Sequence, residues 1–187
     1  MAVTSTSICN SALAKIGAER IVSLESDNNR AKLLKEQYEK LRDELLYAHP
    51  WNFAIARIEL AALADAPLFD FSFQFQLPSD CLRVVGSNIP KDADWQVEGT
   101  LLVCNYDTVI IKYIKQITDT SKFTPAFAEV LACKIAADVC YAITQSTTLQ
   151  KNLDEKYEKQ LRQARSFDAQ ESVGDRVYAD TWLNSRA

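Results

Sequence analysis

The chain has 187 residues and a mass of 21.0 kDa, enough for one large domain or for a domain with a small insertion. Hydrophobic residues make up 48% and charged residues 25%, which argues against a disordered or fibrous protein. The formal net charge of -4 argues against a protein that grips a nucleic-acid backbone over a large surface. No segment is apolar enough for a membrane helix and the first 14 residues lack a basic leader, so we expect a soluble protein.

Residue types that often carry chemistry are scarce. His49 is the only histidine, and its place beside Pro50 at a predicted helix end favours a capping or packing role. The five cysteines form an odd set without a Cys-x-x-Cys pair, which favours buried thiols and synthesis in the cytoplasm. Phosphate-binding, nucleophile-elbow and zinc-protease motifs do not occur in the sequence. We therefore predict no catalytic residue, no cofactor and no metal ligand, and we rank enzyme activity below a non-catalytic role.

Apolar residues spaced three and four apart predict two helices in the first 50 residues. The first covers 4–17, with Thr4 or Ser5 as its N-cap and Gly17 as its stop. The second begins after a cap at Ser26-Asp27 and ends at Pro50.

Two further helices are predicted near the end of the chain. Thr124-Pro125 supplies a cap and a favoured first-turn proline for a helix that is apolar on all sides, and we expect that helix to be central and buried. The segment 147–171 has one apolar stripe and a charged remainder, as expected of a surface helix.

The middle of the chain shows strand patterns. The run 51–60 fits both periods, with strand preferred. Phenylalanine occupies every second position over 69–75, which predicts a strand with one aromatic face packed in the core; a base-stacking platform is the less favoured alternative, because acidic and polar rather than basic residues intervene. A short turn is expected over 81–84, a hairpin over 95–104 and a β-branched strand over 109–117.

These elements predict an α+β fold: a four-helix bundle with an inserted antiparallel β subdomain and a C-terminal arm. The predicted helical lobe comprises 1–51 and 120–171, the β lobe 52–119 and the arm 172–187. The arm has too few apolar residues for a core of its own. Two hypotheses for the arm have equal support. It either anchors the chain to a partner, or it is a frayed end or docks onto its own chain.

Three motifs occur in order along the chain: RDELLYAHPWNFA at 42–54, LPSDCLRV at 77–84 and FTPAFAEVLA at 123–132. Together with ARSFDAQES at 164–172 and WLNSR at 182–186, they make nearly the whole chain resemble the tail tubular protein A family of short-tailed phages. Two other classes stay open from the residues alone. They are a small cytoplasmic enzyme that uses paired carboxylates and a nucleic-acid-binding module.

The resemblance implies a structural virion protein, made in the host cytoplasm and located in the neck of the tail. Such a head-to-tail adaptor forms a homo-oligomeric ring, usually of twelve subunits, between the portal protein above and the tail nozzle protein, with tail fibres, below. Genomic DNA passes through the ring without specific binding, and no membrane is involved. The acidic net charge is compatible with this passage, because each neutralised phosphate would add affinity.

Two groups of candidate residues follow under this resemblance. The first would join the helical lobe to the β lobe, with the indole ring buried between them; its members are His49, Pro50, Trp51 and Phe53. The second would contact the portal or an adjacent subunit and become ordered on assembly. Its members are Val177, Tyr178, Trp182, Leu183 and Arg186.

Overall fold

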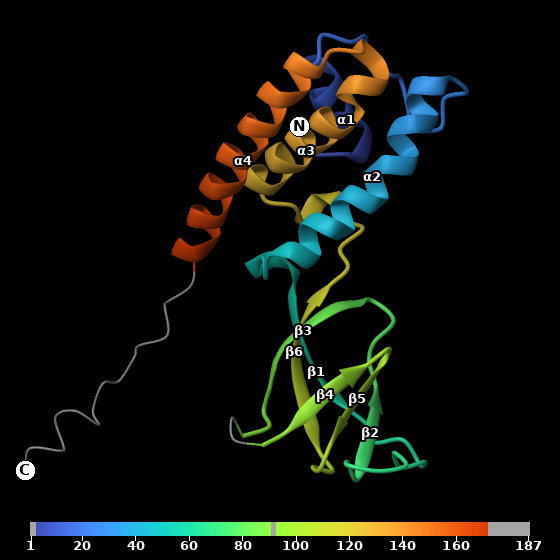
Figure 1. Ribbon diagram of the computed structural model, residues 1–187, viewed down its shortest axis with the longest axis vertical. Coiled ribbons are helices and arrows are strands. Elements are labelled where there is room, and N and C mark those ends of the chain that lie inside the picture. Colours follow the sequence, from blue (N-terminus) through green and yellow to red (C-terminus); the bar gives the residue numbers. More distant parts are fainter. Residues whose placement is uncertain (1–2, 91–92, 172–187) are drawn as a thin grey trace, which may run out of the picture.

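The computed structural model describes residues 3–90 and 93–171. Over these residues the fold is mixed α+β, with four α-helices and two three-stranded antiparallel sheets (Figure 1). The helices are α1 (Ser5–Lys15), α2 (Asn29–Ala48), α3 (Pro125–Thr144) and α4 (Thr147–Gln170), with 3-10 turns η1 (Asn52–Ala54) and η2 (Thr120–Lys122). The strands are β1 (Ile55–Leu60), β2 (Phe73–Gln76), β3 (Cys81–Ser87), β4 (Trp95–Glu98), β5 (Leu101–Cys104) and β6 (Val109–Lys115).

Side-chain caps set the starts of the four helices. Thr4, Thr124 and Ser146 each accept a hydrogen bond from the backbone N–H three residues later, so the predicted starts of α1, α3 and α4 are confirmed. The predicted cap of α2 at 26–27 is wrong. Asn28 has the extended backbone of an N-cap and its Oδ1 accepts from the Ala31 N–H at 2.8 Å, so the cap lies one residue past the predicted pair and α2 begins at Asn29.

Helix α3 lies at the centre of the helical region, and α1, α2 and α4 each pack against it (Figure 1). Phe127, Leu131 and Ile135 on this helix are fully buried, which confirms the prediction of a central, buried helix. None of the helices among the described residues combines the length and apolar character needed to cross a membrane.

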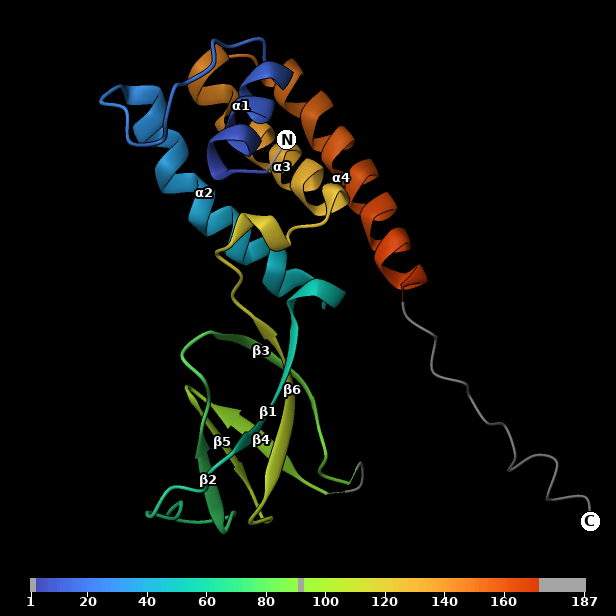
Figure 2. The ribbon, with the colours of Figure 1, turned by 180° about the vertical axis from the view of Figure 1, so that it is seen from behind.

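The two sheets occupy the other end of the molecule (Figure 2). Their strand orders are β1-β6-β3 and β2-β5-β4, with every pair antiparallel. The predicted hairpin is confirmed as β4 and β5, which are joined by Gly99 in the left-handed region at φ +61°. The strand predicted over 109–117 is confirmed as β6. The ambiguous run 51–60 contains both structures, since the turn η1 precedes β1.

The strand predicted over 69–75 is wrong in its first half, because β2 begins only at Phe73. Asp70 has φ +67°, and the Phe71 N–H donates to the Phe69 carbonyl at 2.8 Å. This three-residue γ-turn ends the extended backbone, so the alternating pattern does not produce one aromatic face. Phe75 is fully buried, whereas the side chain of Phe69 is 75% exposed.

The turn predicted over 81–84 is also wrong, because these residues open strand β3. β3 pairs with β6, for example Val84 with Tyr113, so the pairing with a strand far along the chain overrides the local turn signal. The turn lies just before this strand, over 78–81, where the Cys81 N–H donates to the Pro78 carbonyl at 3.0 Å, and Asp80 is part of it. The Asp80 carboxylate accepts from Lys115 Nζ at 2.9 Å and from the Tyr113 hydroxyl at 3.2 Å, which anchors the start of β3 to β6.

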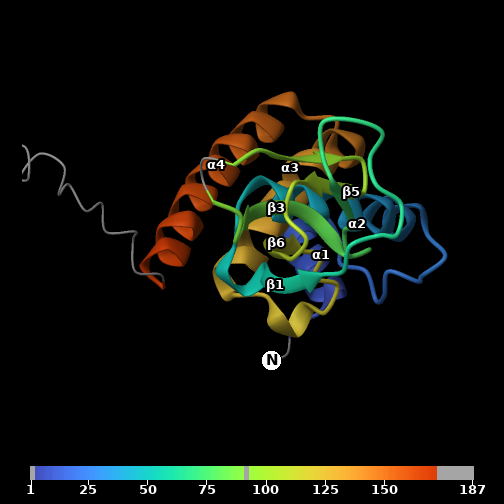
Figure 3. The same ribbon diagram turned by 90° about the horizontal axis from the view of Figure 1, so that it is seen from below.

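Two hydrophobic cores are present. One fills the space between the helices and also takes in Ile114 and Ile117 from the end of β6 and beyond it. The other lies between the two sheets around Phe75, Leu102 and Ile111. In the view along the long axis the sheets overlap the helices, because the two regions are arranged end to end (Figure 3). The chain links these regions twice, before β1 and again after β6.

Candidate functional site

The segment that leaves α2 carries the largest buried side chain at the junction of the helical and sheet regions. Trp51 is 1% exposed, and its indole Nε1–H donates to the Leu45 carbonyl at 3.0 Å. That carbonyl lies in the last turn of α2, where backbone acceptors lack helical donors, so the indole caps the helix. The ring also meets Phe127 of α3 edge-on, with 5.2 Å between ring centroids.

Phe53 continues this contact between the link and the helical core. Its ring lies 5.0 Å from Phe127 and 6.0 Å from Phe123, which precedes α3. The two rings before and on α3 are themselves 4.8 Å apart. An aromatic cluster therefore holds the link before β1 against the link after β6, so that both connections between the regions are packed together.

Asp168, near the end of α4, ties that helix to the same link. Its Oδ1 accepts from the Asn52 N–H at 2.9 Å, and its backbone carbonyl accepts from Asn52 Nδ2 at 2.6 Å. Its Oδ2 lies 3.2 Å from His49 Nε2. The junction thus has three sources, namely the end of α2, the start of α3 and the end of α4. Pro50 separates the α2 C-cap, His49, from the buried indole.

The sequence interpretation missed Asp168. Its only signal is its spacing, since the apolar stripe of α4 runs through Leu161 and Ala164 and the next position on that face is a carboxylate. A charged residue at a buried position of a helix usually has a partner. The partner itself lies 116 residues away in sequence, at Asn52, and no local pattern identifies it.

The surroundings of His49 favour the neutral form of its ring at neutral pH. Burial lowers the pKa of His49 below its ordinary value of 6.5, and this outweighs the hydrogen bond to Asp168, which raises it; the charges of Arg165 and Arg83 lower it further. The unfolded chain therefore binds a proton at this ring more readily than the folded chain does.

We expect the free energy of unfolding to fall as the pH drops below about 6.5 and through the lowered folded-state pKa, with no contribution from this residue above that range. In His49→Gln the amide still donates to Asp168 but does not titrate, so this share of the pH dependence should disappear. Urea unfolding of both proteins between about pH 5 and 7.5 measures it. Equal slopes for the two proteins would contradict the assignment.

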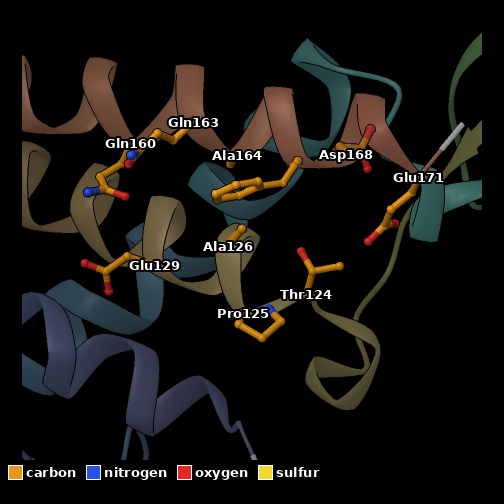
Figure 4. Close-up of a pocket in the computed structure, with 10 residues that line it drawn as sticks. Thr124, Pro125, Ala126, Glu129, Gln160, Gln163, Ala164, Asp168 and Glu171 are labelled. Carbon is orange, nitrogen blue, oxygen red and sulfur yellow. The ribbon is translucent and has the colours of Figure 1, made fainter. Parts of the chain in front are cut away.

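A groove lies beside the junction, between the start of α3 and the second half of α4, with a volume of about 420 Å³ (Figure 4). Figure 4 shows Pro125, Ala126 and Glu129 on one wall and Gln163 and Ala164 on the other. The lining residues are Thr124, Pro125, Ala126, Glu129, Gln160, Gln163, Ala164, Phe167, Asp168 and Glu171. The groove thus reaches the last described residue of the chain.

A second unusual surface lies at the loop between β1 and β2, in the sheet region. Leu68 is completely exposed and Phe69 is 75% exposed, beside the left-handed Asp70. The base of this loop is held in place, since the Leu63 N–H donates to the Gln74 carbonyl at 2.9 Å. The loop is therefore anchored at its base and displays two large apolar side chains at its tip.

Buried thiols and the carboxylate of Asp43 are engaged in packing and in hydrogen bonds within the fold. Burial raises the pKa of Cys9 to about 12 and also raises that of Cys133, so both thiols stay protonated. Asp43 accepts from Arg42 Nε at 2.8 Å and from Gln116 Nε2 at 2.7 Å. Among residues 3–90 and 93–171, no group of three or more metal-ligating side chains is close enough to hold an ion.

The candidate interface residues Val177, Tyr178, Trp182, Leu183 and Arg186 lie outside the described residues. No family model matches the sequence. No curated protein matches it either.

Proposed function

We propose that this chain is a structural virion protein, a head-to-tail adaptor that forms a ring between the portal and the tail nozzle of a short-tailed phage. The proposal starts from the ordered motifs by which the chain resembles the tail tubular protein A family. In this proposal 1–51 and 120–171 act as a four-helix-bundle lobe, 52–119 as an inserted β lobe and 172–187 as an arm. The ring contains several copies, twelve in the family, and DNA passes through it without specific binding.

The observation that carries the proposal is the apolar tip at Leu68 and Phe69. An adaptor has to contact neighbours with exposed surface, and two adjacent large side chains exposed in an anchored loop are typical of a contact point. The strained backbone of Asp70 supports the same interpretation, since such strain is retained where the surrounding structure holds a functional conformation. The nearby charges, Asp65 and Asp70, favour a partner surface with a basic rim.

Contacts between copies are proposed along the charged outer faces of α2 and α4. A ring requires one surface to meet a different surface of the next copy. Exposed ion pairs such as Lys35–Glu25, 2.6 Å apart, contribute little to the stability of a single chain. Their charges therefore remain available for contacts between subunits.

Electron microscopy of the purified chain mixed with its portal, and then with the nozzle protein, tests the function. We expect an added ring on the portal and capture of the nozzle by that ring. The double variant Leu68→Ser with Phe69→Ser should lose one of these two contacts by about a hundredfold in affinity, because two large apolar side chains no longer become buried.

Val22→Ser is the matched control, since Val22 is 94% exposed in the helical region. It should leave both contacts unchanged. Deleting 173–187 should leave the fold intact and weaken docking, because α1–α4, the helices among the described residues, all lie before that segment. Absence of any added ring with the intact chain would contradict the adaptor function, and full retention of both contacts by the double variant would exclude the loop as a contact point.

A further inference from the structure

The surface that lines the groove between α3 and α4 is mostly apolar. Pro125, Ala126, Ala164 and Phe167 supply its apolar surface, and Phe167 is 56% exposed. A large aromatic ring left open to water at the wall of a groove gains free energy when another apolar side chain covers it. Its surroundings therefore suit an apolar or aromatic occupant.

Two of the three carboxylates that line this groove are engaged by other contacts. Glu129 accepts from Lys15 Nζ at 2.6 Å, and Asp168 is bonded to Asn52 and His49. These carboxylates are held by protein partners, so they do not call for a cationic ligand. The apolar wall therefore supplies the main contact surface for an occupant of the groove.

The sequence beyond the described residues provides an occupant of matching character. Residues 172–187 follow directly on Glu171, which lines the groove, and they contain Val177, Tyr178, Trp182 and Leu183. Their charged residues are two aspartates and two arginines, so the segment has no net charge to oppose an approach to Glu171. We propose that 172–187 folds back along α4 and places Val177 and Tyr178 in the groove of its own chain.

Length and turn chemistry permit this return. The groove runs along α4 from Gln160 to Glu171, about 17 Å at 1.5 Å per residue. Gly174 lies three residues past that end and allows a tight reversal. Val177 and Tyr178 follow Gly174 by three and four residues, about 10 and 13 Å when extended. Phe167 and Ala164 lie about 6 and 11 Å back from Glu171 along α4, so the two side chains can reach this wall.

The same chain is a better occupant than a second copy. A segment tethered at the edge of its own groove acts at an effective concentration in the millimolar range. A segment from another chain has only the bulk protein concentration, which is far lower in solution. Before assembly, the arm is therefore held in cis.

One consequence rests on the proposed function. A portal or neighbouring subunit that binds the arm must first displace it from the groove, so the groove restrains the arm until a partner is present. The electron microscopy with portal and nozzle tests the proposed function. The position of the arm is measured separately, on the purified chain alone.

Photo-cross-linking of the full chain tests the position of the arm. In Gln163→p-benzoylphenylalanine the photoreactive group lines the groove, and irradiation should join it to the tryptic peptide 177–186. Arg162→p-benzoylphenylalanine is the matched control, because this neighbouring exposed position on α4 does not line the groove. Adding Val177→Asp and Tyr178→Asp to the first variant should abolish the cross-link.

An equal mixture of light and isotopically heavy chains identifies the origin of the cross-linked peptides by mass. Docking in cis predicts only light–light and heavy–heavy pairs. Mixed pairs would show exchange of the arm between copies and overturn the inference. Absence of any cross-link from position 163 to 172–187, or an equal yield from position 162, would also overturn it.

Discussion

Replacing Trp51 with alanine is expected to lower the free energy of unfolding by about 3–5 kcal/mol. The indole is 1% exposed, lies edge-on to Phe127 and caps the Leu45 carbonyl of α2. The alanine variant loses this apolar burial, leaves a cavity where both links meet, and leaves a carbonyl without its donor. Urea unfolding followed by far-ultraviolet circular dichroism measures the change.

Trp51→Phe separates the two contributions. It keeps an aromatic ring against Phe127 but removes the N–H that caps Leu45, so a smaller loss of about 1–3 kcal/mol is expected. A change below about 0.5 kcal/mol in the alanine variant, the size typical of surface substitutions, would contradict the buried junction.

Local signals predicted the helices well because the features that define them are local. Thr124 with Pro125 marks the start of α3, and the observed cap of α2, Asn28, lies only one residue past the predicted pair 26–27. The same holds for the hairpin at Gly99, where the turn residue and both strands are adjacent in sequence. Periodicity and capping act within a few residues, so a single sequence contains the information needed.

Two of the errors arose where contacts far apart in sequence decide the structure. β3 is a strand because β6 pairs with it, and Asp168 is a junction residue because Asn52 and His49 lie opposite. The loop tip at Phe69 was missed because one left-handed residue, Asp70, interrupts a regular pattern. Periodicity reports the spacing of apolar and polar residues along the sequence, and it carries no information about the backbone angles of a single residue.

Replacing Phe75 with alanine is expected to destabilise the sheet region by about 3–5 kcal/mol. Phe75 is fully buried in the second core, where it packs with Leu102 and Ile111. Phe69→Ala is the matched control, because the same truncation at a side chain that is 75% exposed should change stability by no more than about 0.5 kcal/mol. Equal losses of stability in the two variants would contradict this assignment and support the single buried aromatic face that the alternating pattern predicts.

Hydrogen exchange shows how far this loss spreads through the chain. The core around Phe75 contains no residue of α1–α4, whereas Ile114 of β6 belongs to the helical core. If each core is a separate cooperative unit, Phe75→Ala should speed amide exchange in β2 and β5 while the amides of α3 keep their protection. A matching loss of protection in α3 would instead mean that the aromatic cluster at Trp51 couples both regions into a single unit, because both links between the cores pass through that cluster.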